Sequence, residues 1–182
     1  MKATAKAHPN QGRVEYHGMR DPSLRLPYHD SISLCTAPSE TVTTVELDDS
    51  RSEDTFVVDG EVVTGRGAER ITRVVDHVRE LAGIESRVRL ESENSFPTNV
   101  GLGSSSSGFA AAAMALVGAT ELSLSLPEIS RIARLGSSSA ARAVTGGFSQ
   151  LRAGASHADC ESTRIESPLG DDLRIVIGLV PA

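Results

Sequence analysis

The sequence of 182 residues predicts a mixed α+β domain, with most strands early in the chain and helices packed against the resulting sheet. Three observations support this prediction. Apolar and polar residues alternate through much of the first half, and one helical repeat interrupts them. Beyond residue 96, segments rich in glycine and serine run directly into helix-forming stretches. A chain of this length is enough for one sizeable core.

The expected strands follow the alternation of apolar and polar side chains. They are Ser31–Thr36, Thr41–Leu47, Phe56–Val58, Val62–Val63, a segment around Val88 and Leu90, Phe148–Arg152 and Leu173–Val180. Asp59-Gly60 separates two of these strands and accepts the positive φ angles of a type I′ turn, which predicts a hairpin.

Four helical segments are expected between and after these strands. The first carries apolar residues at helical spacing from Ile71 to Leu81, and Gly83 ends it. The second is Phe109–Leu116, after a loop at Phe96–Gly108. A capping box at Ser125 opens a third helix through Leu135, and a short fourth helix covers Ala140–Ala143. The polar segment Ala153–Asp172 receives no assignment.

Composition narrows the function classes. Acidic residues outnumber basic ones by 24 to 18, and the net charge of −6 argues against nonspecific nucleic-acid binding. No apolar run reaches the roughly 18 residues of a membrane span, and the N-terminus lacks a secretory signal. Cys35 and Cys160 are expected to be free thiols in a reducing compartment. A cytoplasmic protein is therefore expected. Its scarcity of lysine fits a salt-loving host or a high-GC genome.

The clearest motif is the segment from Phe96 to Gly108, which leads into an alanine-rich helix. Gly101 and Gly103 let the backbone approach a ligand without interference from a Cβ atom. The helix start that follows offers unpaired N–H groups and the positive end of a dipole, which bind anions. The four serines at 104–107 add hydroxyls for phosphate or Mg²⁺. A flexible linker is the alternative, and a strong helix former directly after it disfavours that interpretation.

Three familiar motifs do not fit this segment. A Walker loop needs a lysine, and none is present here. The dinucleotide fingerprint GxGxxG lacks its third glycine, because Ser106 stands there. A GxSxG nucleophile elbow cannot be drawn through Gly103–Gly108. The remaining pattern, Pro-x-x-x-Gly-Leu-Gly-Ser-Ser-Ser, resembles the phosphate loop of the GHMP small-molecule kinases. The resemblance implies ATP contacts from Gly101, Gly103, Ser104, Ser105, Ser106 and Ser107, with Ser105 as a Mg²⁺ ligand.

A second glycine-serine turn follows the third expected helix, at Gly136–Ser139. Arg142 lies just beyond it, and its planar guanidinium suits a carboxylate or a phosphate. Taken alone, a surface salt bridge would explain this arginine equally well. The run Ile132-Ala-Arg-x-Gly-Ser-x-Ser-Ala-x-Arg142 before Gly-Gly-Phe resembles the decarboxylase branch of the GHMP superfamily. The resemblance implies that Ser137, Ser138, Ser139 and Arg142 bind the mevalonate portion of the substrate. Arg142 is the implied catalytic residue, holding the carboxylate that leaves as CO₂.

A third segment, from Ala5 to Asp21, is similar to the opening of the diphosphomevalonate decarboxylases. It is closer still to a branch in salt-loving archaea that acts on the monophosphate. The resemblance implies that Tyr16 and Gly18 contact the substrate and that Arg70 faces its phosphate. Relatives usually carry lysine where this chain has Glu15, and often where it has Met19. These two departures favour a less charged substrate or an altered mode of binding.

The resemblance spans nearly the whole chain and implies a two-layer, ribosomal-protein-like sandwich. Residues 1–182 would form the N-terminal ATP- and substrate-binding domain of the GHMP architecture. The implied reaction uses MgATP to phosphorylate the 3-hydroxyl of a 5-phosphorylated mevalonate. Loss of that phosphate with CO₂ leaves isopentenyl phosphate or diphosphate, and the assembly could be a homodimer. Family members continue into a second domain that supplies an aspartate, so this chain alone is expected to be inactive. Another GHMP small-molecule kinase, a non-catalytic nucleotide-binding fragment and a purely structural module are the alternatives.

Overall fold

The structure is a computed structural model that describes residues 1–168 and 172–178. The helices are α1 Gly65–Ala82, α2 Ser104–Ala119, α3 Leu126–Gly136 and α4 Ala140–Thr145. The strands are β1 Lys2–Ala7, β2 Asn10–Val14, β3 Met19–Asp21, β4 Leu26–Pro27, β5 Ser31–Cys35, β6 Thr41–Asp48, β7 Thr55–Val58, β8 Glu61–Val62, β9 Arg87–Asn94, β10 Phe148–Leu151 and β11 Ser162–Arg164.

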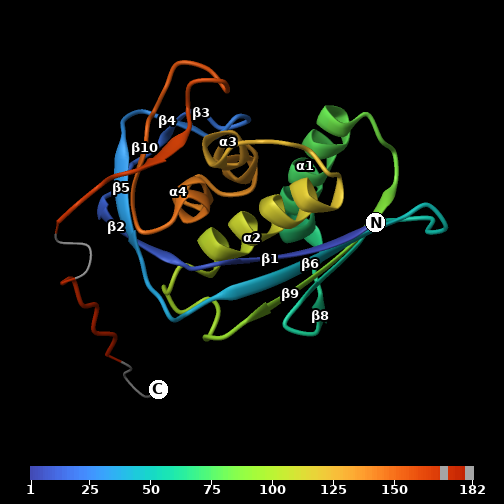
Figure 1. Cartoon of the computed structure of the whole chain (residues 1–182), viewed down its shortest axis with the longest axis horizontal. Helices are drawn as coiled ribbons and strands as arrows, with labels where there is room; N and C mark the ends of the chain where they lie inside the picture. The colour runs from blue at the N-terminus through green and yellow to red at the C-terminus, as the bar shows by residue number, and fades with distance from the viewer. Residues whose placement is uncertain (169–171, 179–182) are drawn as a thin grey trace.

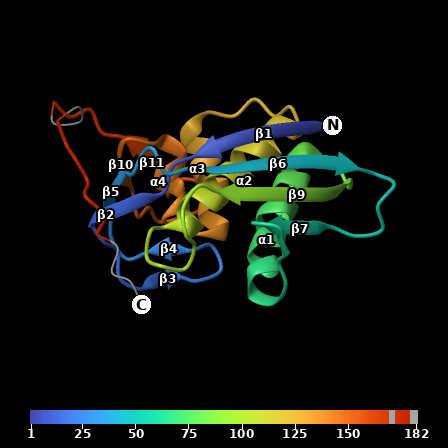
Figure 2. The same cartoon turned by 90° about the horizontal axis from the view of Figure 1, so that it is seen from below.

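The strands form two main sheets, and the helices lie against them (Figure 1). The larger sheet has the order β1-β6-β9-β7-β8, in which only the β7–β9 pair is parallel within the described residues. The smaller sheet has the order β11-β10-β5-β2 and lies at the other end of the molecule, beside the short β3–β4 pair (Figure 2). The predicted mixed α+β class is confirmed.

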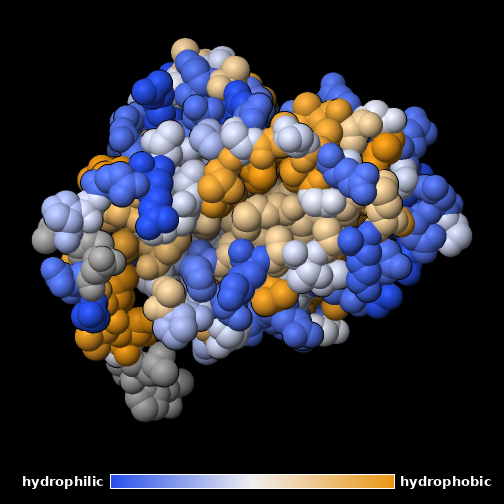
Figure 3. Space-filling model, in the orientation of Figure 1, coloured by the Kyte–Doolittle hydropathy of each residue, from blue (hydrophilic) through white to orange (hydrophobic). Residues whose placement is uncertain are grey.

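Helix α2 occupies the centre of the domain, between the large sheet and the other helices (Figure 1). It is apolar on all sides, and Ala110, Ala111 and Ala113 have no exposed surface. A helix of this kind is stable only when it is buried on every side. Apolar surface runs across the middle of this face, and hydrophilic side chains surround it (Figure 3). None of the helices in residues 1–168 and 172–178 has the length and apolar character of a membrane span.

Local sequence signals account for the ends of several elements. In α1 the predicted apolar positions Ile71, Val74 and Val78 are buried, and Gly83 ends the helix in the left-handed conformation at φ 65°. The predicted capping box of α3 is present, with the Ser125 amide donating to the Glu128 carboxylate over 2.8 Å. The hairpin between β7 and β8 turns at Asp59-Gly60, where both φ angles are positive.

The predicted start of α2 and the predicted last strand are wrong. Helix α2 begins at Ser104 rather than Phe109, because hydrogen bonds between the serines of its first turn and Asn10 and Thr41 replace the apolar contacts that the pattern requires. The predicted strand Leu173–Val180 is not formed by residues 173–178, which lie outside both sheets and leave Val176 92% exposed. A strand needs a neighbour for its backbone groups, and alternation alone does not supply one. Leu179 and Val180 lie outside the described residues.

A fully buried arginine joins α3 to two loops. Arg134 Nε donates to the Cys160 carbonyl over 3.1 Å, and another of its nitrogens donates to the Leu24 carbonyl. Its third nitrogen lies 3.0 Å from Nδ1 of His157, whose ring meets that of His77 edge-on at 5.1 Å. Burial, followed by the charge of Arg134, lowers the pKa of His157 to about 4. His157 is therefore neutral in the folded protein near pH 7.

We expect the free energy of unfolding to decrease as pH falls from about 6.5 toward 4. In this window the unfolded chain protonates His157 and the folded chain resists protonation, so the unfolded state binds more protons. The slope from this single group cannot exceed about 1.4 kcal/mol per pH unit. Urea unfolding at pH 7 and at pH 5 measures the decrease in the free energy of unfolding. The His157→Gln variant, which retains an acceptor for Arg134, should show a smaller decrease, and an equal decrease would refute the assignment.

Candidate functional site

The first candidate element is the turn before α2 together with the first turn of that helix. Gly101 and Gly103 have φ angles of 81° and 84°, and Gly103 is the N-cap of α2 without a side-chain hydrogen bond. Within the described residues the backbone N–H groups of Ser104 and Ser105 have no hydrogen-bond partner. This region, residues 101–107, is called the first serine turn. Its free N–H groups and the helix dipole favour an anion.

The four serines of the first serine turn have different surroundings. Ser106 and Ser107 are buried and bonded within the protein. The Ser106 hydroxyl donates to the Gly103 carbonyl over 2.6 Å, and the Ser107 hydroxyl lies 2.6 Å from that of Thr41 on β6. Ser104 and Ser105 instead line a cavity. The side chains available to a ligand are therefore the first two of the four, whereas the last two hold the turn in place.

The cavity beside the first serine turn has a volume of about 260 Å³. Its wall combines apolar side chains of the large sheet, α1 and α2 with a few polar groups. The lining residues that matter for the site are Val58, Val63, Ile71, Leu90, Ser92, Asn94, Ser104, Ser105 and Phe109. A mostly apolar cleft with a few placed polar groups is typical of a small-molecule site, and here the first turn of α2 forms part of its wall.

The second candidate element is the turn between α3 and α4, residues 136–139, which is called the second serine turn. The hydroxyls of Ser137 and Ser139 lie 3.1 Å apart and face each other. Ser138 is directed away from them, and its hydroxyl is 3.3 Å from the Arg25 carbonyl. Ser137 and Ser139 can therefore bind one ligand together, whereas Ser138 attaches the turn to the loop before β4.

Arg142, on α4, is 1% exposed and lacks a counter-ion among the described residues. Its Nε donates to the Ser33 hydroxyl over 2.9 Å, and another of its nitrogens donates to the Ser31 hydroxyl. The ring of Tyr16 lies 5.9 Å from the guanidinium carbon. Burial lowers the pKa of Arg142, and the nearby Tyr16 and Glu15 partly oppose that effect. A buried cation without a carboxylate is costly, and an anion bound beside Arg142 would offset that cost.

Asn10 connects the two serine turns. Its backbone N–H donates to the Ser106 hydroxyl over 3.1 Å, and its side-chain amide donates to the Ser139 carbonyl over 2.9 Å. The residue is buried at the start of β2. One short strand end therefore brings together two turns that lie far apart in the chain, through contacts with Ser106 and Ser139.

Arg70 reaches the second serine turn from α1. Its Nε donates to the Gly136 carbonyl over 2.9 Å, and its guanidinium carbon lies 4.7 Å from the centre of the Phe109 ring. Gly136 is required here, because a Cβ atom would lie 2.1 Å from that ring. Gly18 is farther out, in the exposed turn between β2 and β3, with the ring of Tyr28 against it. The structure thus gathers Arg70, Arg142 and the two serine turns.

Sequence reasoning missed Asn10, Ser31 and Ser33 as parts of this site. Asn10 gave no signal, since its role depends on two contacts distant in the chain. Ser31 and Ser33 did give one. Both are fully buried on β5, while the intervening Ile32 is only half-buried. Serines on the inner face of a strand need buried partners, and Arg142 is that partner.

Comparison with known proteins identifies the family of the chain. The profile of the family described as "Diphosphomevalonate decarboxylase-like N-terminal domain" matches residues 7–162. The phosphomevalonate decarboxylase of the archaeon Haloferax volcanii is 67% identical over all 182 residues, which cover 56% of that protein. The chain spans about half the length of the relatives that it matches.

Two solved structures are similar over most of the chain. The mevalonate diphosphate decarboxylase from Enterococcus faecalis matches with a TM-score of 0.86 at 36% identity, over 91% of this chain and 52% of that one. A structure of MDDEF in complex with MVAPP, AMPPCP and magnesium matches with a TM-score of 0.87 at 35% identity, over 93% of this chain and 52% of that one. The expected N-terminal GHMP fold and the expected archaeal branch are confirmed. The chain belongs to the family of diphosphomevalonate decarboxylase-like N-terminal domains.

Proposed function

We propose that this chain binds MgATP and a 5-phosphorylated mevalonate, as the N-terminal domain of an ATP-dependent decarboxylase. Residues 1–182 would form the ATP- and substrate-binding domain. The observation that supports this most directly is the link through Asn10, which holds the two serine turns side by side. Transfer of a phosphoryl group depends mainly on holding donor and acceptor in line, and adjacent anion sites provide that arrangement.

The first serine turn would bind the phosphates of ATP. The backbone contacts would come from Gly101, Gly103 and the N–H groups of Ser104 and Ser105. Ser106 and Ser107 hold the turn in place through their hydrogen bonds within the protein. The apolar cavity next to it would take the base. The exposed Ser105 hydroxyl, which has no partner among the described residues, is the oxygen ligand that this turn offers to Mg²⁺. The ion would neutralise phosphate charge.

The second serine turn and its neighbours would bind the mevalonate. Arg142 holds the carboxylate that leaves as CO₂, with Tyr16 beside it, while Ser137 and Ser139 bind the polar groups between the two ends. Arg70 faces the 5-phosphate. Burial lowers the pKa of Arg70, and the charge of the neighbouring Arg25 lowers it further. An anion bound here would offset both the burial of the charge and the repulsion between the two arginines.

The substrate proposed is mevalonate 5-phosphate, and the product isopentenyl phosphate. The chain is 67% identical to a phosphomevalonate decarboxylase but only 36% identical to a mevalonate diphosphate decarboxylase. Glu15 supports the same choice. Its carboxylate folds back against Gly12, its charge acts on Arg142, and it stands where relatives of this family usually carry a lysine. A carboxylate there disfavours a second phosphate.

Calorimetry of the 182-residue chain tests the proposed function. We expect ATP to bind only when Mg²⁺ is present, and mevalonate 5-phosphate to bind more tightly than the diphosphate. A chain that binds ATP but neither phosphorylated mevalonate would instead support another kinase of the same superfamily.

The Glu15→Lys variant should shift the preference toward mevalonate 5-diphosphate, by about two- to five-fold in relative affinity, as expected for one exposed charge pair. Titration of both ligands into both proteins measures the shift. Glu53→Lys, an equal charge change in an exposed loop distant from the site, should leave the ratio unchanged. If Glu15→Lys and Glu53→Lys have the same effect, Glu15 takes no part in substrate choice.

A further inference from the structure

Four arginines lie together at the N-terminal half of α1 and in the loop before β4. Arg66, Arg70 and Arg73 follow one another at i, i+4 and i+7, so they share one face of the helix. Arg25 comes from the loop, where the bond from Ser138 to its carbonyl holds it beside the second serine turn. These four residues are called the arginine cluster. Burial, followed by the charges of Arg73 and Arg66, lowers the pKa of Arg25, and burial, followed by the charges of the other three members, lowers the pKa of Arg70.

None of these arginines forms an ion pair within the part of the chain that the structure describes. Arg79, on the same helix, does form ion pairs. Arg79 contacts Asp54 at 2.5 Å and Asp76 at 3.0 Å. Because acidic residues exceed basic ones by 24 to 18, counter-ions are plentiful in this chain. Like charges one helical turn apart destabilise a helix, so this arrangement has a cost that calls for a function.

Arg25 shows the cost most clearly. Its Nε is buried and has no hydrogen-bond partner among the described residues. Its backbone is in the left-handed region, with φ at 54°, which is unfavourable for a residue with a side chain. A buried, charged donor without an acceptor calls for an explanation, and a bound ligand that supplies the acceptor is one.

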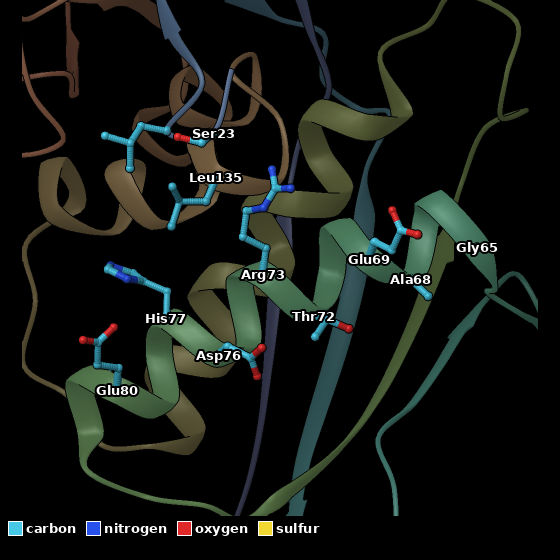
Figure 4. A pocket seen from close by; sticks show the side chains of 11 residues that line it. Ser23, Gly65, Ala68, Glu69, Thr72, Arg73, Asp76, His77, Glu80 and Leu135 are labelled. Atoms are coloured by element: carbon cyan, nitrogen blue, oxygen red, sulfur yellow. The ribbon is translucent and has the colours of Figure 1, made fainter. Parts of the chain in front are cut away.

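The surroundings also favour an anion. Helix α1 starts without a side-chain cap or an acidic residue in its first turn, so the positive end of its dipole is uncompensated. Arg70 lines the cavity beside the first serine turn. Arg73 lines a second cavity of about 840 Å³ with Ser23 and Leu135, and this second cavity also carries the carboxylates of Glu69, Asp76 and Glu80. Figure 4 shows Arg73 extending from α1 toward the Leu135 side of this second cavity. The arginine cluster therefore borders both cavities, one through Arg70 and the other through Arg73.

We propose that Arg25, Arg66 and Arg73 bind the phosphate group of the substrate together with Arg70, and that they select a phosphorylated mevalonate over the unphosphorylated acid. The proposal rests on the proposed function. A phosphate monoester carries up to two charges and three acceptor oxygens, and guanidinium groups match those oxygens in pairs. The missing acceptor of the Arg25 Nε would be one of them.

The test compares ligands that differ only in the phosphate. We expect Arg25→Gln to raise the Kd of mevalonate 5-phosphate by about 10- to 100-fold, the effect of one lost charge-assisted hydrogen bond, and to leave the Kd of mevalonate unchanged. The affinity of the variant should also depend less steeply on salt. Arg66→Gln, on the exposed first turn of α1, should act in the same direction and serves if Arg25→Gln does not fold. Arg87→Gln, at the far end of β9, is the control of equal charge change.

Three outcomes are decisive. If Arg25→Gln and Arg66→Gln bind mevalonate 5-phosphate as tightly as the parent chain does, the arginine cluster is not the phosphate site, although the proposed function stands. If both ligands weaken equally, the arginines act only through the fold, and the proposal is wrong. If the parent chain binds neither ligand but binds inorganic phosphate in a way that Arg25→Gln removes, the anion site is supported and the proposed function fails.

Discussion

Replacing Gly103 by valine should abolish ATP binding. At this position φ is 84°, and a Cβ atom would lie 2.9 Å from the Asn10 carbonyl oxygen. A branched side chain would therefore either leave the left-handed conformation or displace the start of β2. Either movement alters the N–H groups of Ser104 and Ser105. Calorimetry with ATP and Mg²⁺ gives the affinity, and a thermal melt establishes that the variant is folded.

A matched substitution separates backbone strain from the contact with Asn10. Gly83 also has a positive φ, of 65°, but no atom lies within 4 Å of the Cβ position. Gly83→Val thus bears a similar conformational cost, about 1–2 kcal/mol, at the distant end of α1. We expect it to lower the melting temperature and to preserve ATP affinity. Unchanged affinity in Gly103→Val would contradict the assignment of the first serine turn.

Replacing Arg142 by glutamine should weaken the binding of mevalonate 5-phosphate by about 100-fold, because a buried charge-assisted contact is lost. Stability should change much less. The variant loses a charge that has no counter-ion among the described residues, which relieves a desolvation cost, while glutamine can still hydrogen-bond to Ser31 or Ser33. The variant would then lose much of its affinity for the ligand but little of its stability, as expected for a residue at a ligand site.

The readout for Arg142 can isolate the carboxylate. Isopentenyl phosphate lacks the carboxylate of mevalonate 5-phosphate, so only the latter should respond strongly to Arg142→Gln. Arg152→Gln, an exposed arginine after β10, serves as the control. If Arg142→Gln weakened the two ligands equally, the guanidinium would not be the carboxylate contact, and the assignment of the leaving group would have to be revised.

The fold could be predicted where the determinants are local. The stop at Gly83, the capping box at Ser125 and the hairpin at Asp59-Gly60 each depend on residues within one turn of one another, and each is present. The start of α2 could not be placed, because Ser106 and Ser107 are held by Asn10 and Thr41, far away in the sequence. Strand Leu173–Val180 was predicted from alternation, which does not identify a pairing partner.

The candidate site likewise contains parts that the sequence could predict and parts that it could not. The two serine turns were identifiable because glycine and serine beside a helix start have a direct chemical meaning. The arginine cluster was only partly visible: Arg70 was identified from a family resemblance, whereas Arg25 comes from a loop with no pattern of its own. Ser31 and Ser33 alternate with Ile32 and Leu34, and the usual assumption that the apolar residues face inward assigns the strand the wrong face.

The link from Ser107 to Thr41 continues, because the Thr41 hydroxyl also lies 2.6 Å from the Asn94 side-chain oxygen. Three segments, α2, β6 and β9, are thus joined at the base of the first serine turn. Fixing the backbone of one residue costs about 1–2 kcal/mol in conformational entropy at room temperature. In this protein much of the conformational entropy of the first serine turn is already lost when the chain folds. A nucleotide arriving at residues 101–105 therefore meets a turn already in shape, and a larger share of its contact energy remains as affinity.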